Sequence, residues 1–275
     1  MSRVAVRTPI VRYRDGSFSS RSDTVSGEEP LELRIGGKAF TTTMRTPGAD
    51  IELAHGLLHA EGVITAREDV LSARYCSGVG PDGRNTYNVL EVNLSDPAAA
   101  ERVQPRTMVT NSACGVCGAE SIDAITRISR YRPGSLTMTP ATISALPDHL
   151  RARQRTFRLT GGLHACALAT PDGLIEEIRE DVGRHNAMDK VIGAALLADR
   201  LPLTDRALLT SSRASFELVQ KATLAGVGML IAVSAPSSLA VQLAEQAGLT
   251  LIGFTSATGF NIYTGAWRVS GATER

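Results

Sequence analysis

The chain has 275 residues, of which 43% are hydrophobic and 21% are charged. These proportions are typical of a folded globular protein and exclude a disordered, fibrous or low-complexity chain. The 29 basic and 28 acidic residues give a net charge of +1, so no overall electric field attracts nucleic acid or an anionic membrane surface. We find neither the apolar core of a signal peptide nor an apolar run of membrane-spanning length, and we expect a cytoplasmic protein.

The first half of the chain is predicted to be an arm followed by a small α+β domain over residues 30–140. Residues 1–29 are polar and rich in serine, and we expect a flexible, irregular arm. Regular structure is predicted from Pro30, where apolar and polar residues begin to alternate on either side of a Gly36-Gly37 turn. The predicted elements are a hairpin over 31–44, a helix over 47–61 that ends at Gly62, a strand over 87–94 and a helix over 119–128.

The second half is predicted to be an α/β domain over residues 141–275, with a mixed sheet flanked by helices. Two successive strand-helix units that end in a strand favour parallel pairing with right-handed crossovers. The predicted elements are strands over 163–169 and 174–180, a helix over 184–197, a strand over 207–210, a helix over 215–225, a strand over 229–233, a helix over 239–247 and a strand over 250–254.

A pair of cysteines two residues apart is the strongest chemical signal in the sequence. Cys114 and Cys117 are flanked by Gly115 and Gly118, which free the backbone around the thiols. A helix predicted from Ala119 would direct its positive end toward them and favour the thiolate, which is the nucleophile in sulfur transfer. A persulfide at this position could be passed on or resolved by the neighbouring thiol.

Zinc binding and thiol–disulfide exchange are alternative roles for the cysteine pair. One CxxC is half of a structural zinc site, but Cys76, Cys166, His164 and His185 show no ligand-like spacing for the other half. Thioredoxin-like exchange requires the motif directly after a strand, and the residues before Cys114 fit this only loosely. For Cys76 and Cys166 we favour inert, buried thiols.

Polar segments follow three of the predicted strands in the second half. They contain Ser211, Ser212 and Arg213, then Ser234 to Ser238, then Thr255 to Gly259. Because the carboxyl ends of parallel strands share one edge of a sheet, we expect these segments to lie together and to hold phosphate at helix N-termini. Simple N-capping by Ser215 and Ser238 would explain the same serines without a ligand.

Charged residues crowd the segment that begins at Asp181, which also contains Arg184, His185, Asp189 and Lys190. A charged surface would explain them, but Asp181 could instead orient His185 for proton transfer, and we favour a functional role. His55 and His59 lie four residues apart on a predicted helix. For this pair, which lacks a third ligand, we favour surface or core packing over a metal site.

Two long motifs resemble the FdhD family. They are Asn111-Ser-Ala-Cys-Gly-Val-Cys-Gly-Ala-Glu-Ser-Ile-Asp123 and Glu180-Asp-Val-Gly-Arg-His-Asn-Ala-Met-Asp-Lys-Val-Ile-Gly193. Shorter matching segments, which extend the resemblance from about Pro30 to Thr264, are Arg45 to Asp50, His55 to Leu58, Thr160 to His164, Ser211 to Ser215 and Ser234 to Ser238.

This resemblance implies a sulfurtransferase needed for formate dehydrogenase activity. In the family, the motif cysteines accept sulfur from a cysteine desulfurase and pass it to the bis-molybdopterin guanine dinucleotide form of the molybdenum cofactor. Cys114 matches the persulfide carrier, with Cys117 beside it. The resemblance also implies a cytidine-deaminase-like fold for the second half and a homodimer. We expect no resident metal and, from the balanced charge and the lack of a long apolar run, no nucleic acid or membrane partner.

By the same resemblance, the segment Phe254 to Tyr263 is expected to be a loop that contacts the cofactor, although it contains no arginine. The residues expected to bind the cofactor are Phe254, Thr255, Ser256, Ala257, Thr258, Gly259, Ser211, Ser212, Arg213, Ser234 and His185.

Two further functions stay open beside sulfur transfer. A zinc deaminase acting on a nucleobase would share the expected fold, but the chain lacks the His-x-Glu and Pro-Cys-x-x-Cys motifs of such enzymes. A non-catalytic chaperone would bind the cofactor and the apo-dehydrogenase without carrying sulfur. Replacement of Cys114 distinguishes the chaperone, which should keep working, from the sulfur carrier.

Overall fold

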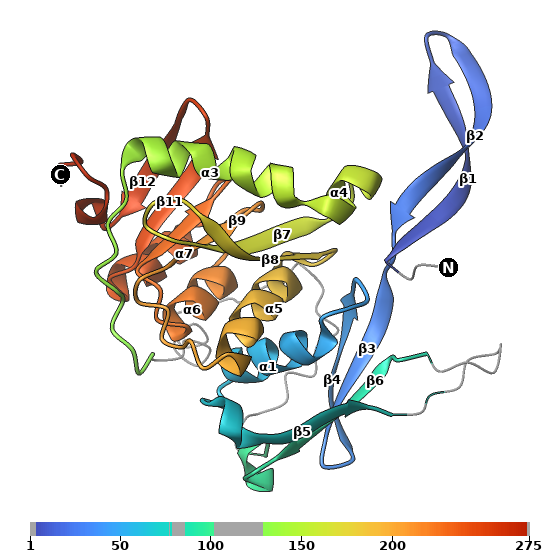
Figure 1. The fold of residues 1–275 in the computed structure, drawn as a ribbon, viewed down its shortest axis with the longest axis horizontal. Helices are drawn as coiled ribbons and strands as arrows, with labels where there is room; N and C mark the ends of the chain where they lie inside the picture. Colours follow the sequence, from blue (N-terminus) through green and yellow to red (C-terminus); the bar gives the residue numbers. More distant parts are fainter. Residues whose placement is uncertain (1–3, 77, 79–85, 102–128, 274–275) are drawn as a thin grey trace.

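The computed structural model describes residues 4–76, 78, 86–101 and 129–273. It contains a six-stranded sheet, a four-stranded sheet and a two-stranded hairpin (Figure 1). Helices pack on both sheets, so the α+β class expected from the sequence is confirmed. None of the helices among these residues is long and apolar enough to cross a membrane.

The larger sheet forms the centre of the second half of the chain. Its strand order is β12-β11-β10-β9-β7-β8, with β9, β10 and β11 parallel and the other neighbours antiparallel. Its strands are β7 (His164–Ala169), β8 (Ile175–Asp181), β9 (Ala207–Thr210), β10 (Met229–Ala232), β11 (Thr250–Ser256) and β12 (Gly259–Thr264).

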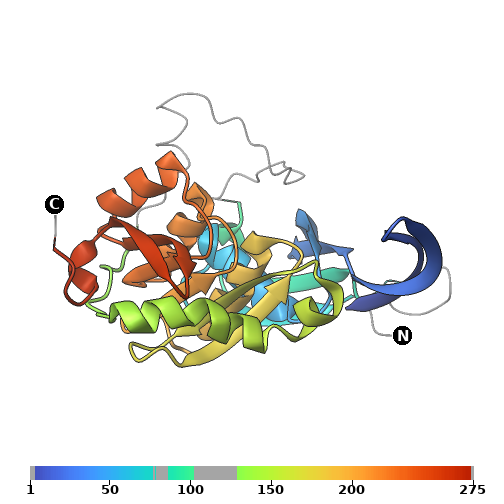
Figure 2. The ribbon, with the colours of Figure 1, turned by 90° about the horizontal axis from the view of Figure 1, so that it is seen from above.

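Helices cover both faces of this sheet (Figure 2). Successive side chains of β7 point to opposite faces of the sheet. Cys166 and Leu168 pack among residues of α5, α6 and α7 on one face. Ala165 and Ala167 pack with α3 on the other face. The helices are α3 (Pro140–Arg153), α4 (Arg155–Thr160), α5 (Arg184–Leu197), α6 (Phe216–Leu224) and α7 (Ser238–Gln246).

The smaller sheet has the strand order β4-β3-β6-β5 and packs against helix α1. Leu53 and Leu58 of the helix are buried against Leu33, Leu90 and Val92 of the sheet. The elements are β3 (Glu29–Ile35), β4 (Lys38–Arg45), α1 (Asp50–Ala60), β5 (Val70–Tyr75) and β6 (Val89–Leu94).

The two parts of the chain meet where α1 crosses α5. A methyl group added at Gly56 would lie 1.9 Å from the carbonyl oxygen of Asp189, and one added at Gly193 would lie 1.8 Å from that of Glu52. The two glycines therefore allow the helix backbones to touch, and no side chain fits at either position.

The sequence predicts most of the elements around the larger sheet correctly. The helix over 184–197 and the strand over 207–210 have the bounds of α5 and β9, and the turn at Gly36-Gly37 joins β3 to β4. The predictions missed β5, α3 and α4. A signal for α3 was present, since Thr139 caps its first turn and Pro140 is its first residue. The helix predicted over 119–128 lies outside the described residues.

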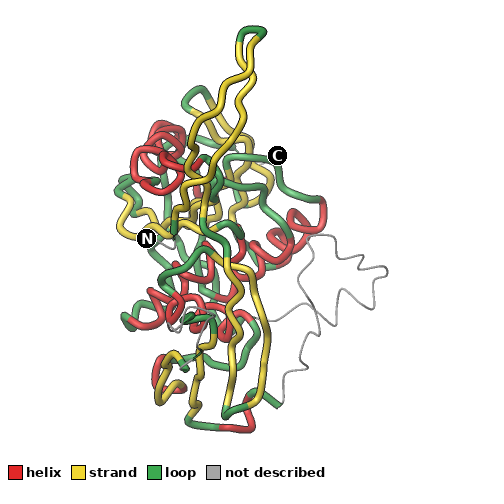
Figure 3. The backbone as a smooth tube through the Cα atoms, turned by 90° about the vertical axis from the view of Figure 1, so that its right-hand side faces the viewer, coloured by secondary structure: helices red, strands yellow, loops and turns green. Residues whose placement is uncertain are grey.

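Two predictions of irregular structure are wrong. Residues 5–26 of the expected irregular arm form a hairpin of β1 (Ala5–Arg14) and β2 (Ser17–Ser26), which projects from the body (Figure 3). The expected loop from Phe254 to Tyr263 is also a hairpin, because β11 continues to Ser256 and β12 returns antiparallel to it. In both segments, pairing with a neighbouring strand satisfies the backbone of a polar sequence.

Candidate functional site

Three polar segments lie side by side at the carboxyl ends of the parallel strands. The amide of Ser234 donates to the carbonyl of Ser212 (3.4 Å), and the amide of Phe254 donates to the carbonyl of Ser234 (3.3 Å). A parallel bridge between Ala214 and Pro236 links the first two segments again. The prediction that these segments share one edge of the sheet is thus confirmed. We call this edge the rim, defined by residues 211–215, 233–238 and 254–258.

Most rim hydroxyls bond within the protein. The Ser212 hydroxyl donates to the carbonyl of Arg213 (3.0 Å) and lies 2.9 Å from the Thr210 hydroxyl. The Ser211 hydroxyl accepts from the amide of Ala165 (2.9 Å), and the Thr255 hydroxyl donates to the carbonyl of Ala232 (2.9 Å). These groups shape the rim and are less suited to bind a ligand than sequence reasoning suggests.

The two helices that begin at the rim differ in their first turn. Ser237, rather than Ser238 as predicted, caps α7 by accepting from the amide of Ala240 (3.3 Å). Ser215 occupies the same position before α6, but its side chain makes no capping bond. The first amides of α6 therefore lack the side-chain acceptor that usually satisfies them.

The Ser215 hydroxyl instead contacts His185 at the start of α5. The His185 Nε2 atom lies 3.3 Å from the Ser215 oxygen and 2.7 Å from Glu217 Oε2. Glu217 is a residue that the sequence analysis missed. It lies 32 positions from His185, and its only signal was an acidic side chain in the first turn of a helix that opens at the rim.

Cationic groups gather around this end of α5 and α6. The pKa of His164 is lowered, first by burial and then by the charges of Arg184 and His185. The Nε atom of Arg184 is buried and has no hydrogen-bond partner among the described residues. Arg213 is exposed at the rim, and its guanidinium forms no ion pair within the described part of the chain. The guanidinium groups of Arg184 and Arg213 therefore lie at this end of the sheet, together with the carboxylate of Glu217 that pairs with His185.

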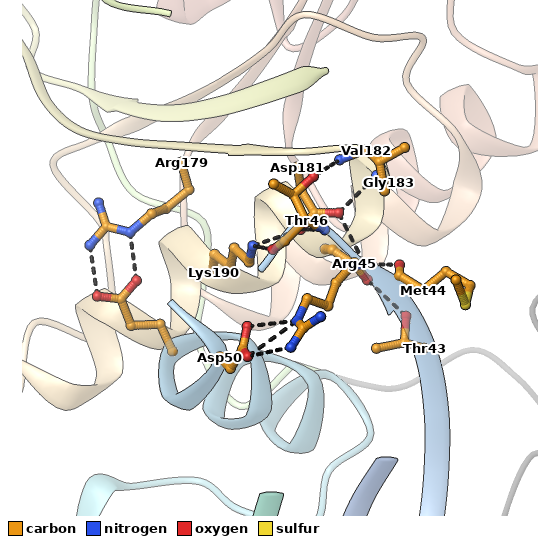
Figure 4. Close-up of polar contacts among 12 residues, drawn as sticks. Thr43, Met44, Arg45, Thr46, Asp50, Arg179, Asp181, Val182, Gly183 and Lys190 are labelled. Atoms are coloured by element: carbon orange, nitrogen blue, oxygen red, sulfur yellow. Dashed lines mark hydrogen bonds and ion pairs between the residues drawn. The ribbon is translucent and has the colours of Figure 1, made fainter. Parts of the chain in front are cut away.

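The motif that begins at Asp181 has a structural role in joining the two parts of the chain (Figure 4). Asp181 is 0% exposed, and its Oδ2 atom accepts from Lys190 Nζ (2.6 Å) and from the amide of Thr46 (3.1 Å). Asn186 donates to Asp181 Oδ1 (3.2 Å) and to the carbonyl of Met44 (2.8 Å). The hypothesis that Asp181 orients His185 is not supported, because Asp181 bonds to these groups and His185 pairs with Glu217.

A second buried ion pair lies beside this network. Arg45 and Asp50 are 0% and 2% exposed, and Arg45 donates from Nε and Nη2 to the carboxylate at 3.0 Å each. Arg45 also donates to the carbonyl of Tyr87 (3.2 Å), and Tyr75 donates to Asp50 (3.0 Å). These bonds hold the start of α1 against the smaller sheet.

His55 and His59 are both buried, which agrees with core packing. The Nδ1 atom of His55 lies 2.7 Å from the carbonyl oxygen of Ile51. His59 Nδ1 has no partner among the residues described, and burial, together with the charges of Arg130 and Lys221, lowers its pKa to about 4.

His59 should make the protein less stable in acid. The unfolded chain binds this proton near pH 6.5 and the folded chain only near pH 4, so the stability due to neutral His59 is lost as the pH falls between these values. We expect wild type to lose about 2 to 3 kcal/mol more than His59→Gln between pH 7 and pH 4.5, as measured by urea unfolding. The exposed His149→Gln variant is the control. Parallel losses in all three proteins would contradict this prediction.

Cys76 and Cys166, the two cysteines outside the motif, were predicted to be inert, buried thiols, and the structure buries them to different degrees. Cys166 in β7 is fully buried, and burial raises its pKa far above the ordinary value. Cys76, after β5, is half-buried. Cys114 and Cys117 lie outside the described residues. Ser129 is the first described residue after the two motif cysteines, and its hydroxyl donates to the carbonyl of Thr223 near the end of α6 (2.9 Å).

Comparison with known proteins decides the family. The model of the FdhD/NarQ family matches residues 26–270. The chain belongs to the FdhD/NarQ family. The resemblance found in the two long sequence motifs is thereby confirmed.

Relatives named sulfur carrier protein FdhD cover nearly the whole chain. The protein from Nocardia farcinica is 51% identical over 97% of this chain and 95% of its own length. The one from Mycolicibacterium paratuberculosis is 52% identical over 97% of this chain and 99% of its own length. These names support a general role of the family in sulfur transfer.

A solved structure has the same fold. The crystal structure of a protein from Desulfotalea psychrophila, assigned as a formate dehydrogenase accessory protein, matches with a TM-score of 0.74 at 22% identity. The match covers 97% of this chain and 99% of that chain. It supports the mixed α/β architecture described above.

Proposed function

We propose that the chain is a sulfurtransferase that carries sulfur as a persulfide on Cys114, with Cys117 beside it. The thiolate of Cys114 would attack the outer sulfur of a cysteine desulfurase persulfide, form a new S–S bond and release the desulfurase thiolate. Release of the outer sulfur at the sulfide level, toward the bis-molybdopterin guanine dinucleotide cofactor of formate dehydrogenase, would break the S–S bond. The two electrons would come from a thiolate, that of Cys117 or of a free thiol, which attacks the sulfur of Cys114 and leaves a disulfide. The long cysteine motif and the sulfur carrier names of the relatives support this proposal.

Mass spectrometry of the intact protein tests the sulfur-carrying step. After incubation with a cysteine desulfurase and cysteine, one added sulfur should appear on the peptide that contains Cys114 and Cys117. Cys166 should remain unmodified, because its thiol is buried and protonated. Sulfur spread equally over all four cysteines, or found on none, would contradict the proposal.

The rim is the proposed binding site for the guanine dinucleotide part of the cofactor. The observation that supports it is the uncapped first turn of α6 among Arg184, His185 and Arg213. Amides at a helix start and nearby guanidinium groups are the groups that bind phosphate in proteins. Phe254 is an exposed residue of the rim and offers a ring on which a base could stack.

Binding of GDP tests this site separately from sulfur transfer. With millimolar GDP and a dissociation constant of roughly 100 μM, binding to the folded state would stabilise the protein by about 1.4 kcal/mol and raise the melting temperature by a few degrees. ATP should have a smaller effect, because adenine and guanine present different hydrogen-bonding edges.

Arg213→Ala should reduce the GDP effect without changing the labelling of Cys114. Arg206→Ala is the matched control, since Arg206 lies at the opposite end of β9 and pairs there with Glu176 (2.8 Å). Equal stabilisation by ATP and GDP, or none by either, would contradict the assignment of the rim.

Formate dehydrogenase, a cysteine desulfurase and a second copy of the chain are the proposed protein partners, in the cytoplasm. The alternative function is a chaperone that binds the cofactor at the rim without carrying sulfur. The rim geometry suits both functions, whereas the cysteine motif favours the carrier.

A further inference from the structure

The amino-terminal hairpin leaves most of its surface uncovered. β1 and β2 pair over Ala5–Arg14 and Ser17–Ser26 and form a sheet of their own, which projects from the body and meets it at α4 (Figures 1 and 3). An isolated two-stranded hairpin is at best marginally stable in water. A further strand or another surface is therefore needed to stabilise it.

The two faces of the hairpin differ in character. Tyr13 and Phe18 are paired at its tip with ring centroids 5.0 Å apart, and they are 63% and 76% exposed. Val11, on the same face, is 69% exposed. On the opposite face, β2 presents Arg21 and Asp23, neither of which forms an ion pair with another described residue.

No strand among the described residues pairs with the outer edge of β2. The amide of Gly27 donates to the carbonyl of Val4 (2.8 Å), and this bond fixes which residues of β2 direct their backbone groups toward β1. Because the backbone groups of successive residues point to opposite edges of a strand, the N–H and C=O groups of Ser20, Ser22 and Thr24 point outward, away from β1. The outer edge of β1 is interrupted by Pro9, which lies opposite Ser22 and has no N–H group.

We infer that β2 pairs with β2 of a second copy of this chain, antiparallel and with Ser22 on the twofold axis. In this register the outward backbone groups of the two strands meet, and Arg21 lies opposite the partner's Asp23. The twofold symmetry repeats the pair, so two cross-strand ion pairs form. A twofold axis at Ser20 or at Thr24 would also match outward backbone groups, but it would leave Arg21 and Asp23 opposite uncharged residues. The charges therefore favour the register with Ser22 on the axis.

The same register covers the apolar tip. It places Phe18 opposite Ser26 at the base of the partner's hairpin, and Ser26 lies against Gly162 just after α4. Leu159 of α4 is 66% exposed there. The tip of each arm thus meets an exposed apolar side chain of the other copy, and the contact is the same in both directions.

This inference depends on the homodimer of the proposed function and adds its surface. Sedimentation analysis of the full chain tests it. Arg21→Asp and Asp23→Arg should each replace two opposite-charge pairs by two like-charge pairs and raise the dimer dissociation constant about tenfold or more. The double variant, with both changes in the same chain, should restore the dimer because each new charge again faces its opposite.

Two further variants separate the interface from the fold. Arg12→Asp makes the same charge change on β1 and should leave the dimer intact. Ser22→Pro removes the outward N–H group at the twofold axis and should weaken the dimer while the melting temperature of the body stays the same. A dimer that persists in both single charge variants would overturn this surface. A monomeric wild type would overturn the dimer itself, while persulfide formation on Cys114 would still test sulfur transfer.

Discussion

Cys114→Ala should abolish the activation of formate dehydrogenase and leave the protein folded. The proposed transfer needs a thiolate that can hold the outer sulfur, and alanine has no nucleophile. Complementation of a strain that lacks its own copy measures the effect as formate dehydrogenase activity, which should fall to the level without the protein. Cys117→Ala should reduce activity less or slow turnover, since by resemblance Cys114 is the carrier.

Cys76→Ala is the matched control for this experiment. It removes the same group from a half-buried position outside the motif, and activation should be retained. Cys166→Ala is less suitable because it would leave a cavity in the core. Full activation by Cys114→Ala would eliminate the carrier function and leave the chaperone as the remaining function.

Lys190→Met should be among the most destabilising single substitutions in the chain. The ammonium group of Lys190 is the only cation in direct contact with the Asp181 carboxylate among the described residues, and the two side chains are 2% and 0% exposed. Removing it leaves an uncompensated buried charge, which costs about 3 to 5 kcal/mol. The free energy of unfolding in urea measures this loss.

Two variants show whether the loss comes from burial. Lys190→Met combined with Asp181→Asn removes both charges, so the double variant should be more stable than Lys190→Met alone. Lys38→Met breaks an exposed ion pair with Glu101 (3.1 Å) and should cost little, because water screens such pairs. Equal losses for Lys190→Met and Lys38→Met would contradict the role assigned to the network.

Local sequence patterns predicted the elements that lie in the core around the larger sheet. The helix over 184–197 and the strand over 207–210 agree with the structure because their apolar residues recur with the period of a helix or run without interruption through the sheet. The position of the rim followed from the same patterns, since strands that alternate with helices pair in parallel and place their carboxyl ends together. The order of the strands in the smaller sheet did not follow, because β3 pairs with β6 and the paired residues, such as Glu32 and Val89, are 57 positions apart.

The sequence by itself determined the family, the α+β class and the cysteine motif, because each depends on residue identity and spacing along the chain. Only the tertiary structure decided that Asp181 bonds to Lys190 and Thr46, that His185 pairs with Glu217, and that the amino-terminal arm is a hairpin. The partner of a buried polar group is whichever group the packed elements bring within hydrogen-bond distance. Thr46 lies 135 positions from Asp181, and no spacing along the chain encodes that contact.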